Sequence, residues 1–167
     1  GINKELAAEN DVPFIIGRNE DDNKAAVKEI EKTGGKAKYI TAELIKPEEC
    51  ERAVKKIVSE SGRIDGLVNN AGVNDGVGLE AGNYDAFISS LHKNLIHYYL
   101  TAHFALPELK KTKGAVVNIG SKTAETGQGN TSAYAASNGG RNALTREWAV
   151  ELLKYGIRVN AVIVAEC

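Results

Sequence analysis

The chain has 167 residues, of which 43% are hydrophobic and 26% are charged, and its formal net charge is −1. This composition is typical of a single folded domain and excludes a disordered chain. The near balance of basic and acidic residues leaves no positive patch for nucleic acid or for an anionic membrane surface. No apolar run approaches the length that spans a bilayer, so we expect neither nucleic acid nor a membrane as a partner.

Cysteine and histidine usage gives no sign of a metal centre. Cys50 and Cys167 lie in unrelated contexts without metal-ligand spacing, so we interpret both as free thiols in a reducing compartment. His92, His97 and His103 lack a second ligand four residues away, which favours surface or hydrogen-bonded core histidines over metal ligands. The first residues contain no apolar signal core, and we therefore expect a cytoplasmic protein.

Short apolar runs alternate with longer amphipathic segments along the chain. After a helical pattern at residues 4–8, strands are predicted at 12–17, 36–42, 64–69, 115–119 and 158–164, with helices at 22–33, 47–61, 84–111 and 134–154. Pro47 begins one of these helices at a position where its missing N–H does no harm. Strands without polar alternation, separated by helices, indicate an α/β fold with a doubly wound, Rossmann-like parallel sheet.

The two ends of the chain favour an incomplete sheet. No strand precedes the helical pattern at residues 4–8, and no helix follows the apolar strand at 158–164. A parallel sheet without its first strand leaves backbone groups of a neighbouring strand unpaired. We therefore expect residues 1–167 to be a single truncated domain whose sheet lacks its first and last strands.

Two groups of polar residues follow predicted strands, and sheets of this kind bind ligands outside the carboxyl ends of their strands. The turn Asn69-Asn70-Ala71-Gly72 is small enough for a flat ring or a ribose to approach closely. Ser121 follows the next strand, and Tyr134 begins a helix. A nearby positive charge lets a tyrosine hydroxyl act as acid or base, and a serine can hold the reacting oxygen. From the residues alone, an ordinary turn and an unrelated Ser–Tyr pair stay open as alternatives.

Taken together, these segments resemble the short-chain dehydrogenase/reductase family. The matching segments, in order along nearly the whole chain, are Asn69-Asn70-Ala71-Gly72, Asn94, Asn118-Ile119-Gly120-Ser121, Tyr134 and Arg158-Val159-Asn160-Ala161. The stretches VNNAGVNDGVGLE, NLIHYY and SKTAETGQGNTSAYAAS are also similar to bacterial L-fucose dehydrogenase-like members. The resemblance implies an oxidoreductase that transfers a hydride between NAD or NADP and a hydroxyl or carbonyl of a small sugar or polyol-like substrate.

The resemblance also implies roles for individual residues. Tyr134 would donate and accept the proton, Ser121 would hydrogen-bond the reacting oxygen, and Asn94 would hold a helix irregularity and a water of the proton relay. The residues that would bind the cofactor are Asn70, Ala71 and Gly72, then Glu43 and Leu44 at the adenine, and Gly1 and Ile2 in the glycine-rich turn. The substrate would contact Gln128 and Asn130. Arg18, just after the strand at 12–17, either pairs with a 2′-phosphate and favours NADP or is a solvated turn arginine.

Three departures from the family pattern stand out. Asn138 replaces the lysine that the family places four residues after the tyrosine, and it has no charge to make the tyrosine proton labile. Of the glycine-rich turn only Gly1-Ile2-Asn3 is present, and Val164-Ala165 stands where Pro-Gly is common. We therefore expect little or no turnover from this chain. In a full-length protein with an intact glycine-rich turn, Asn138→Lys should restore the rate by orders of magnitude.

Two other interpretations stay open. One is a non-catalytic, degenerate or truncated remnant that at most binds nucleotide or pairs with another subunit, which Asn138 favours. The other is a flavodoxin-like binding module, which leaves Ser121 and Tyr134 unexplained. By analogy with the family, we expect a homo-oligomer formed through residues 134–153, where small residues permit close approach and Trp148 is placed to anchor the contact.

Overall fold

The computed structural model describes residues 1–165, so Cys167 lies outside the described residues. The helices are α1 (Ile2–Ala8), α2 (Glu20–Glu31), α3 (Pro47–Ser61), α4 (Tyr84–Leu91), α5 (His97–Thr112), α6 (Thr123–Thr126) and α7 (Ser132–Glu151). The strands are β1 (Phe14–Gly17), β2 (Lys38–Thr41), β3 (Gly66–Asn69), β4 (Ala115–Ser121) and β5 (Arg158–Val164). A π-helical turn, His92–Ile96, joins α4 to α5, and a 3₁₀ turn, Leu153–Tyr155, follows α7.

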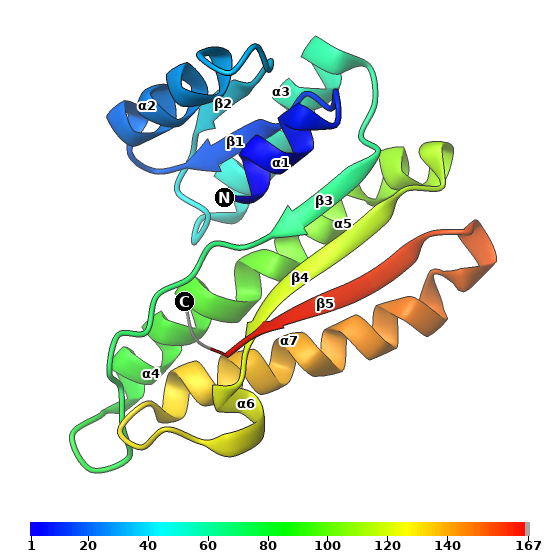
Figure 1. Cartoon of the computed structure of the whole chain (residues 1–167). Coiled ribbons are helices and arrows are strands. Elements are labelled where there is room, and N and C mark those ends of the chain that lie inside the picture. Colours follow the sequence, from blue (N-terminus) through cyan, green and yellow to red (C-terminus); the bar gives the residue numbers. More distant parts are fainter. Residues whose placement is uncertain (166–167) are drawn as a thin grey trace.

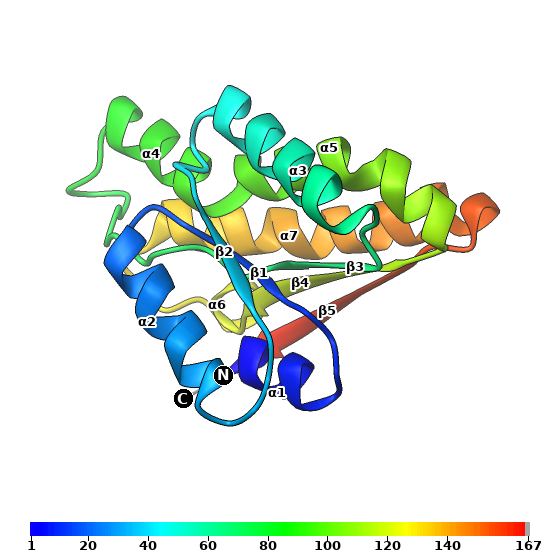
Figure 2. The ribbon, with the colours of Figure 1, turned by 90° about the horizontal axis from the view of Figure 1, so that it is seen from above.

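The strands form two parallel sheets. β1 pairs with β2, and β4 lies between β3 and β5. Two of the helices, α1 and α2, lie on one side of the strands, and α3, α5 and α7 lie on the other (Figures 1 and 2). The doubly wound, Rossmann-like α/β class predicted from the sequence is therefore confirmed. Instead of one continuous sheet there are two, because β1 and β3 form no backbone ladder with each other.

Local sequence explains where several helices begin and end. The Asn19 side chain caps α2 by accepting hydrogen bonds from two backbone N–H groups, those of Asp21 at 2.9 Å and Asp22 at 3.2 Å. Pro47 occupies the first turn of α3, and Gly62 ends this helix with a φ of 74°, a left-handed conformation that favours glycine.

The main hydrophobic core lies between the three-stranded sheet and the helices α3, α5 and α7. Its buried residues include Val54, Leu109, Val116, Trp148 and Val159. Two smaller clusters lie on opposite sides of β1 and β2, one beneath α1 and α2 and the other beneath α3. Each fully buried large apolar side chain stabilises the fold by roughly 1.5–3 kcal/mol. This core holds the carboxyl ends of β3, β4 and β5 in fixed relation.

The structure refines the predicted elements at two places. The predicted helix at 84–111 is interrupted by the π turn around Asn94, and α6 is a single turn that the pattern did not show.

No described helix has the length and hydropathy needed to cross a membrane. Within residues 1–165, no group of three or more His, Cys, Asp or Glu side chains is placed to hold a metal ion.

Candidate active site

A pocket of about 310 Å³ lies at the carboxyl ends of β4 and β5. It is lined by the turn after β3, the end of β4, two residues of α7 and the end of β5: Asn70, Gly72, Ile119, Gly120, Ser121, Tyr134, Arg141, Val164 and Ala165. Four of the residues singled out in the sequence, Asn70, Gly72, Ser121 and Tyr134, are therefore brought together. Parallel strands end at one edge of the sheet, which is why segments far apart in the sequence meet here.

Two residues that carry hydroxyl groups, Ser121 and Tyr134, line this pocket. Ser121 is the last residue of β4, and its Oγ accepts hydrogen bonds from the backbone N–H of Thr123 at 3.3 Å and from the Thr123 hydroxyl at 3.1 Å. Because Oγ already accepts two hydrogen bonds, its own proton is placed to donate to an oxygen in the pocket. Tyr134 lies half-buried in the first turn of α7.

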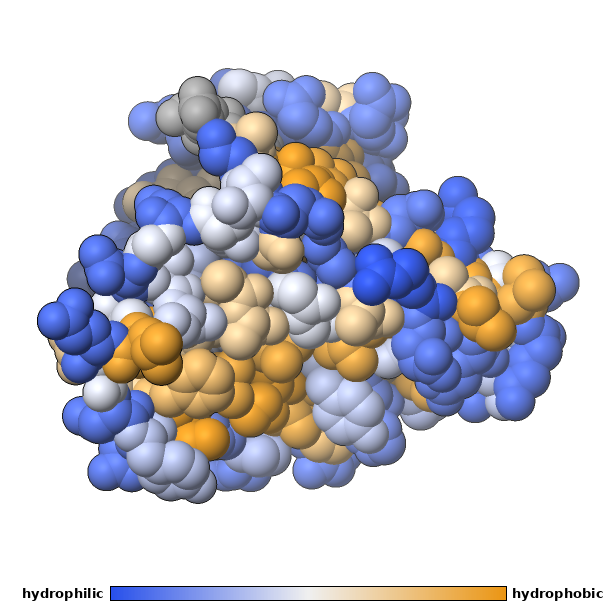
Figure 3. Space-filling model, turned by 90° about the horizontal axis from the view of Figure 1, so that it is seen from below, coloured by the Kyte–Doolittle hydropathy of each residue, from blue (hydrophilic) through white to orange (hydrophobic). Residues whose placement is uncertain are grey.

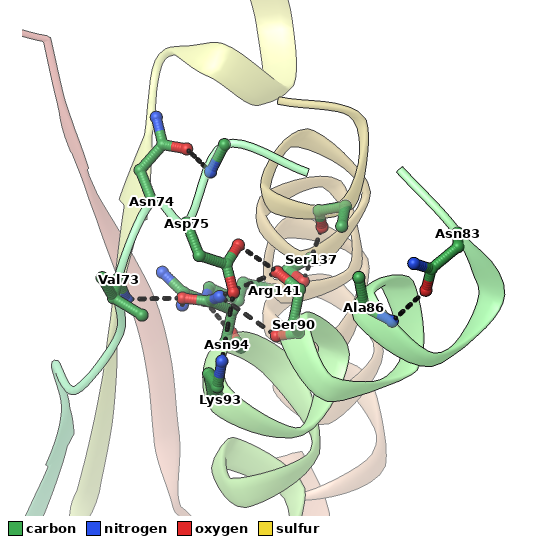
Figure 4. Close-up of polar contacts among 12 residues, drawn as sticks. Val73, Asn74, Asp75, Asn83, Ala86, Ser90, Lys93, Asn94, Ser137 and Arg141 are labelled. Carbon is green, nitrogen blue, oxygen red and sulfur yellow. Dashed lines mark hydrogen bonds and ion pairs between the residues drawn. The ribbon is translucent and has the colours of Figure 1, made fainter. Parts of the chain in front are cut away.

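Asn94 is buried at the centre of the π-helical turn (Figure 4). Its Oδ1 accepts a hydrogen bond from the Val73 backbone N–H at 2.7 Å, and its Nδ2 donates to the Ser90 carbonyl at 3.0 Å. Single π turns occur frequently at functional sites. The Asn94 side chain does not line the pocket; it ties the turn after β3 to the helix behind it.

Arg141 brings a positive charge into the pocket, a role that was not predicted from the sequence. The residue is 4% exposed, and its Cζ lies 4.3 Å from the centroid of the Tyr98 ring and 6.0 Å from that of the Tyr134 ring. Burial lowers the pKa of Arg141, whereas the Tyr98 and Tyr134 side chains act in the opposite direction. Arginine keeps its proton in proteins, so the group stays a cation. A spacing of seven residues from Tyr134, about two helical turns, was the available signal.

Asn138, which replaces the family's lysine, is fully buried and does not line the pocket. Its Nδ2 donates to the Tyr134 carbonyl at 2.9 Å, and its Oδ1 accepts a hydrogen bond from Arg141 at 3.1 Å. The expectation that Tyr134 lacks a neighbouring cation is therefore wrong. Position 138 is neutral, but its side chain contacts a cation that comes from one turn further along the helix.

The turn after β3 serves both the framework and the pocket. Asn69 is buried, and its Nδ2 donates to Asn118 Oδ1 at 3.0 Å. Asn70 and Gly72 line the pocket. The Ala71 carbonyl lies 3.0 Å from His97 Nε2, so this residue is attached to α5 and is not part of the lining.

The residues assigned to the remainder of the cofactor lie outside this pocket. Gly1 and Ile2 form the start of α1, and the exposed Arg18 directly follows β1. Glu43 and Leu44 follow β2: the Glu43 backbone N–H donates to Glu49 at 2.7 Å, and the Leu44 carbonyl accepts from the Cys50 thiol at 3.2 Å. Arg18, Glu43 and Leu44 thus lie at the carboxyl ends of β1 and β2.

The two residues assigned to the substrate, Gln128 and Asn130, lie in the loop between α6 and α7 and do not line the pocket. Gln128 Oε1 accepts a hydrogen bond from Asn74 Nδ2 at 3.4 Å. Asn130 has a φ of 53°, a conformation that asparagine tolerates better than most residues. This loop therefore contacts the loop after β3, beside the pocket.

The profile of the family described as short chain dehydrogenase matches residues 1–167, and the chain belongs to this family. An uncharacterized oxidoreductase of Thermotoga maritima is 35% identical over 97% of this chain and 66% of its own length. L-fucose dehydrogenase of Rattus norvegicus is 32% identical over 74% of this chain and 46% of its own length. The family interpretation made from the sequence is thereby confirmed, and the relatives include L-fucose dehydrogenases.

Solved structures of the family share this fold. The crystal structure of Cj0485 dehydrogenase has a TM-score of 0.93 and 40% identity, over 99% of this chain and 63% of that protein. A metagenomic short-chain oxidoreductase in complex with NADP has a TM-score of 0.90 and 27% identity, over 99% of this chain and 75% of that protein. The chain spans about half to two thirds of the length of the two curated relatives described above.

Proposed function

We propose that this chain carries the reaction site of an NAD(P)-dependent oxidoreductase that interconverts a hydroxyl and a carbonyl on a small sugar or polyol-like substrate. One observation carries the proposal: Ser121 and Tyr134 line a single pocket together with Asn70 and Gly72. A structure with Ser121 and Tyr134 on opposite faces of the sheet would have excluded this reaction site. The family and the dehydrogenase names of its relatives support the reaction class.

The pocket residues act on the oxygen of the substrate. Ser121 donates a hydrogen bond to that oxygen, where negative charge develops during the reaction. Tyr134 takes the hydroxyl proton during oxidation and returns it to the carbonyl oxygen during reduction. Asn94 lies behind this pair, where its carbonyl and amide oxygens accept hydrogen bonds from Arg141, and it is the proposed link between the pocket and a proton relay. The loop that contains Gln128 and Asn130 borders the substrate.

The donor set fits the flat ring and ribose of a nicotinamide nucleotide. Gly72 and Gly120 present backbone to the pocket, and Asn70 offers an amide. When bound, the cofactor supplies or accepts the hydride at the reacting carbon. In the proposed dinucleotide-binding domain of residues 1–167, Ala71 supports this region. Gly1, Ile2, Glu43 and Leu44 serve the more distant parts of the nucleotide, and Arg18 would meet a 2′-phosphate if NADP is used.

The test uses the protein that contains residues 1–167, with aldoses and polyols as substrates and NAD(P)H absorbance as the signal. We expect Tyr134→Phe to lower kcat by about 10³-fold or more and Ser121→Ala by about 10²-fold, because both changes remove groups that act at the reacting oxygen. Nucleotide affinity should change little in both variants. Tyr84→Phe, at a tyrosine that is 77% exposed, is the matched control. Full activity of Tyr134→Phe would exclude the proposal.

A non-catalytic nucleotide-binding or subunit-pairing protein is the second candidate, and the neutral Asn138 is the observation that favours it. This candidate predicts binding of NAD(P) without turnover of any aldose or polyol, and the same binding after Tyr134→Phe. The two functions are therefore separated by the same set of measurements.

We further propose that the protein forms a homo-oligomer through residues 134–153. Ala136 and Ala143 of α7 are exposed, and a shallow apolar hollow beside them is lined by Leu95, Gly140, Ala143, Leu144 and Glu147. The underside of the molecule as drawn in Figure 1, to which α7 contributes, carries a broad apolar area (Figure 3). Trp148 was expected to anchor this contact, but it is only 7% exposed and packs in the main core.

We propose a cytoplasmic location on the basis of the cysteine chemistry. Cys50 is a buried free thiol, and burial raises its pKa to about 11, so it stays reduced and unreactive at neutral pH. A free thiol of this kind is typical of proteins in a reducing compartment.

A further inference from the structure

Helix α7 places Tyr134, Asn138 and Arg141 along one face. Positions separated by four and by seven residues lie above one another on an α-helix. Helical side chains lean towards the N-terminus, so the long Arg141 side chain extends back along this face towards Tyr134. The guanidinium reaches the pocket that Tyr134 lines, although its backbone is about 10 Å further along the helix axis.

The guanidinium of Arg141 is held by neutral acceptors (Figure 4). Its Nε donates to the Asn94 carbonyl at 2.5 Å, and a terminal nitrogen lies 3.4 Å from Asn94 Oδ1. The other terminal nitrogen donates to the Ile119 carbonyl and to Asn138 Oδ1, both at 3.1 Å. Within residues 1–165 no carboxylate forms an ion pair with it. The positive charge of the guanidinium is therefore held in place without a neutralising carboxylate, at the pocket that Arg141 lines.

Gly72 provides the space for this arrangement. A Cβ at position 72 would lie 2.7 Å from a terminal nitrogen of Arg141 and 2.8 Å from Asn94 Oδ1. Both distances are too short for ordinary packing, so any side chain at position 72 would displace the guanidinium or the amide. The turn after β3, the π turn and α7 are therefore fitted to one another around this cation.

We infer that Arg141 supplies the positive charge that makes Tyr134 an effective acid and base, and that Asn138 orients Arg141. This inference rests on the proposed function. During oxidation Tyr134 accepts the substrate proton as the hydride leaves the carbon for the nicotinamide, and during reduction both transfers reverse. Arg141 stays protonated throughout and stabilises the phenolate form of Tyr134. It is a positioning residue that acts through Tyr134.

The other groups near this pair titrate outside the useful pH range or are bound elsewhere. Tyr98 of α5 faces Arg141, and burial raises its pKa to about 12, while its hydroxyl donates to the Ile119 carbonyl at 3.0 Å. His97 contacts Tyr98, and burial lowers its pKa below the ordinary 6.5. Glu125 of α6 accepts a hydrogen bond from Asn142 at 2.8 Å. The effect of Arg141 on the pH–rate profile is therefore read as the difference between the parent and its variants, in which these other groups are unchanged.

The experiment measures kcat and KM for oxidation between pH 6 and 11 in the protein that contains residues 1–167. Because oxidation requires the phenolate, the rate rises with pH, and loss of the cation should move this rise to higher pH. For Arg141→Met we expect about 100-fold lower kcat at pH 7 and a rise displaced by about two pH units, since one unit corresponds to tenfold. Arg141→Lys should fall between this variant and the parent. Arg146→Met removes an exposed cation from the same helix and should leave the profile unchanged.

The decisive variant moves the charge to the position that the family uses. Asn138→Lys combined with Arg141→Met should have a kcat at least tenfold higher than that of Arg141→Met alone. Its pH–rate profile should also move back to lower pH. A purely structural Arg141 would not be rescued by a lysine at 138. Asn138→Lys alone should change the rate by less than tenfold, because Arg141 already provides the charge; this replaces the larger gain expected from the sequence.

Three outcomes decide the inference. A parent-like profile in Arg141→Met overturns it, and Tyr134→Phe then still tests the proposed function separately. If Arg141→Met does not fold, the neutral variant Arg141→Gln takes its place: a parent-like profile in Arg141→Gln also overturns the inference, as does displacement without recovery when Asn138→Lys is added. Displacement in Arg141→Met with recovery in the double variant supports it. Full activity of Tyr134→Phe would reject the proposed function itself, and with it the inference that rests on it.

Discussion

His97 lies at the start of α5 with both ring nitrogens near backbone carbonyls. Nδ1 is 3.2 Å from the His92 carbonyl and Nε2 is 3.0 Å from the Ala71 carbonyl. A neutral imidazole can donate to only one of these acceptors. Burial nevertheless lowers the pKa of His97, more than the two carbonyls raise it. The folded protein therefore favours the neutral ring, which holds Ala71 against the helix.

This lowered pKa predicts a pH-dependent stability. Between the lowered pKa of the folded state and the ordinary 6.5 of the unfolded chain, unfolding takes up a proton at this histidine, so the free energy of unfolding falls as the pH falls through that window. The slope from this one group is at most about 1.4 kcal/mol per pH unit. Urea unfolding between pH 5 and 8 should show a shallower acid limb for His97→Gln than for the parent. His103→Gln, at an exposed histidine, should leave the limb unchanged; equal limbs for both variants would contradict the assignment.

Among the elements, β3, β4, α5 and α7 are joined by a buried chain of polar side chains. Asn69 accepts a hydrogen bond from the Thr101 hydroxyl at 2.7 Å and donates to Asn118 at 3.0 Å. Asn118 in turn donates to the Thr145 hydroxyl at 3.0 Å, and Thr145 donates to the Arg141 carbonyl at 2.8 Å. Buried hydrogen bonds of this kind specify one arrangement of the elements. The chain connects the turn after β3 to the helix that carries Tyr134.

Asn118→Ala tests the value of this chain of hydrogen bonds. The change leaves Asn69 Nδ2 only the Tyr98 carbonyl at 3.4 Å and removes a donor from Thr145, so we expect a loss of about 1–3 kcal/mol in the free energy of unfolding, the cost of one incompletely satisfied buried group. Asn160→Ala, at an exposed position on the neighbouring strand β5, should cost less than about 0.5 kcal/mol. Denaturant midpoints measure both. A similar small loss for Asn118→Ala would show that the polar chain adds little stability.

At the same scale, the sequence predicted the order and type of the long elements, because strong apolar periodicity determines them. The irregularity at Asn94 was expected only through the family resemblance, and the structure shows it to be a π turn; apolar periodicity alone predicted an unbroken helix, because an i to i+5 hydrogen bond leaves no pattern in a single sequence. Ser121 and Tyr134 could be assigned to one site, because both follow the carboxyl side of β4. Arg141 could not, because its place in the pocket depends on how Asn94, Gly72 and α7 pack together.

For the whole molecule, the association proposed through α7 gives a testable expectation. Ala143 is exposed beside the apolar hollow that Leu95 and Leu144 line, so an arginine there would place a bulky charge in the interface. We expect Ala143→Arg to reduce the sedimenting mass of the protein at micromolar concentration. Ala25→Arg, at an exposed alanine of α2, is the matched control and should leave the mass unchanged. A monomeric parent, or an unchanged mass in Ala143→Arg, would contradict the proposed interface.

The face shared by Tyr134 and Arg141 has a consequence for how other members of the family are recognised. A search pattern that requires lysine four residues after the tyrosine discards this chain as inactive. Yet an arginine two turns after the tyrosine lies on the same helix face and extends back to the pocket that the tyrosine lines. A pattern with arginine seven residues after the tyrosine, and glycine at the position of Gly72, would select the chains to which our inference about Arg141 extends. In such sequences, the absence of the usual lysine would then mean that the positive charge is carried by another residue of the same helix.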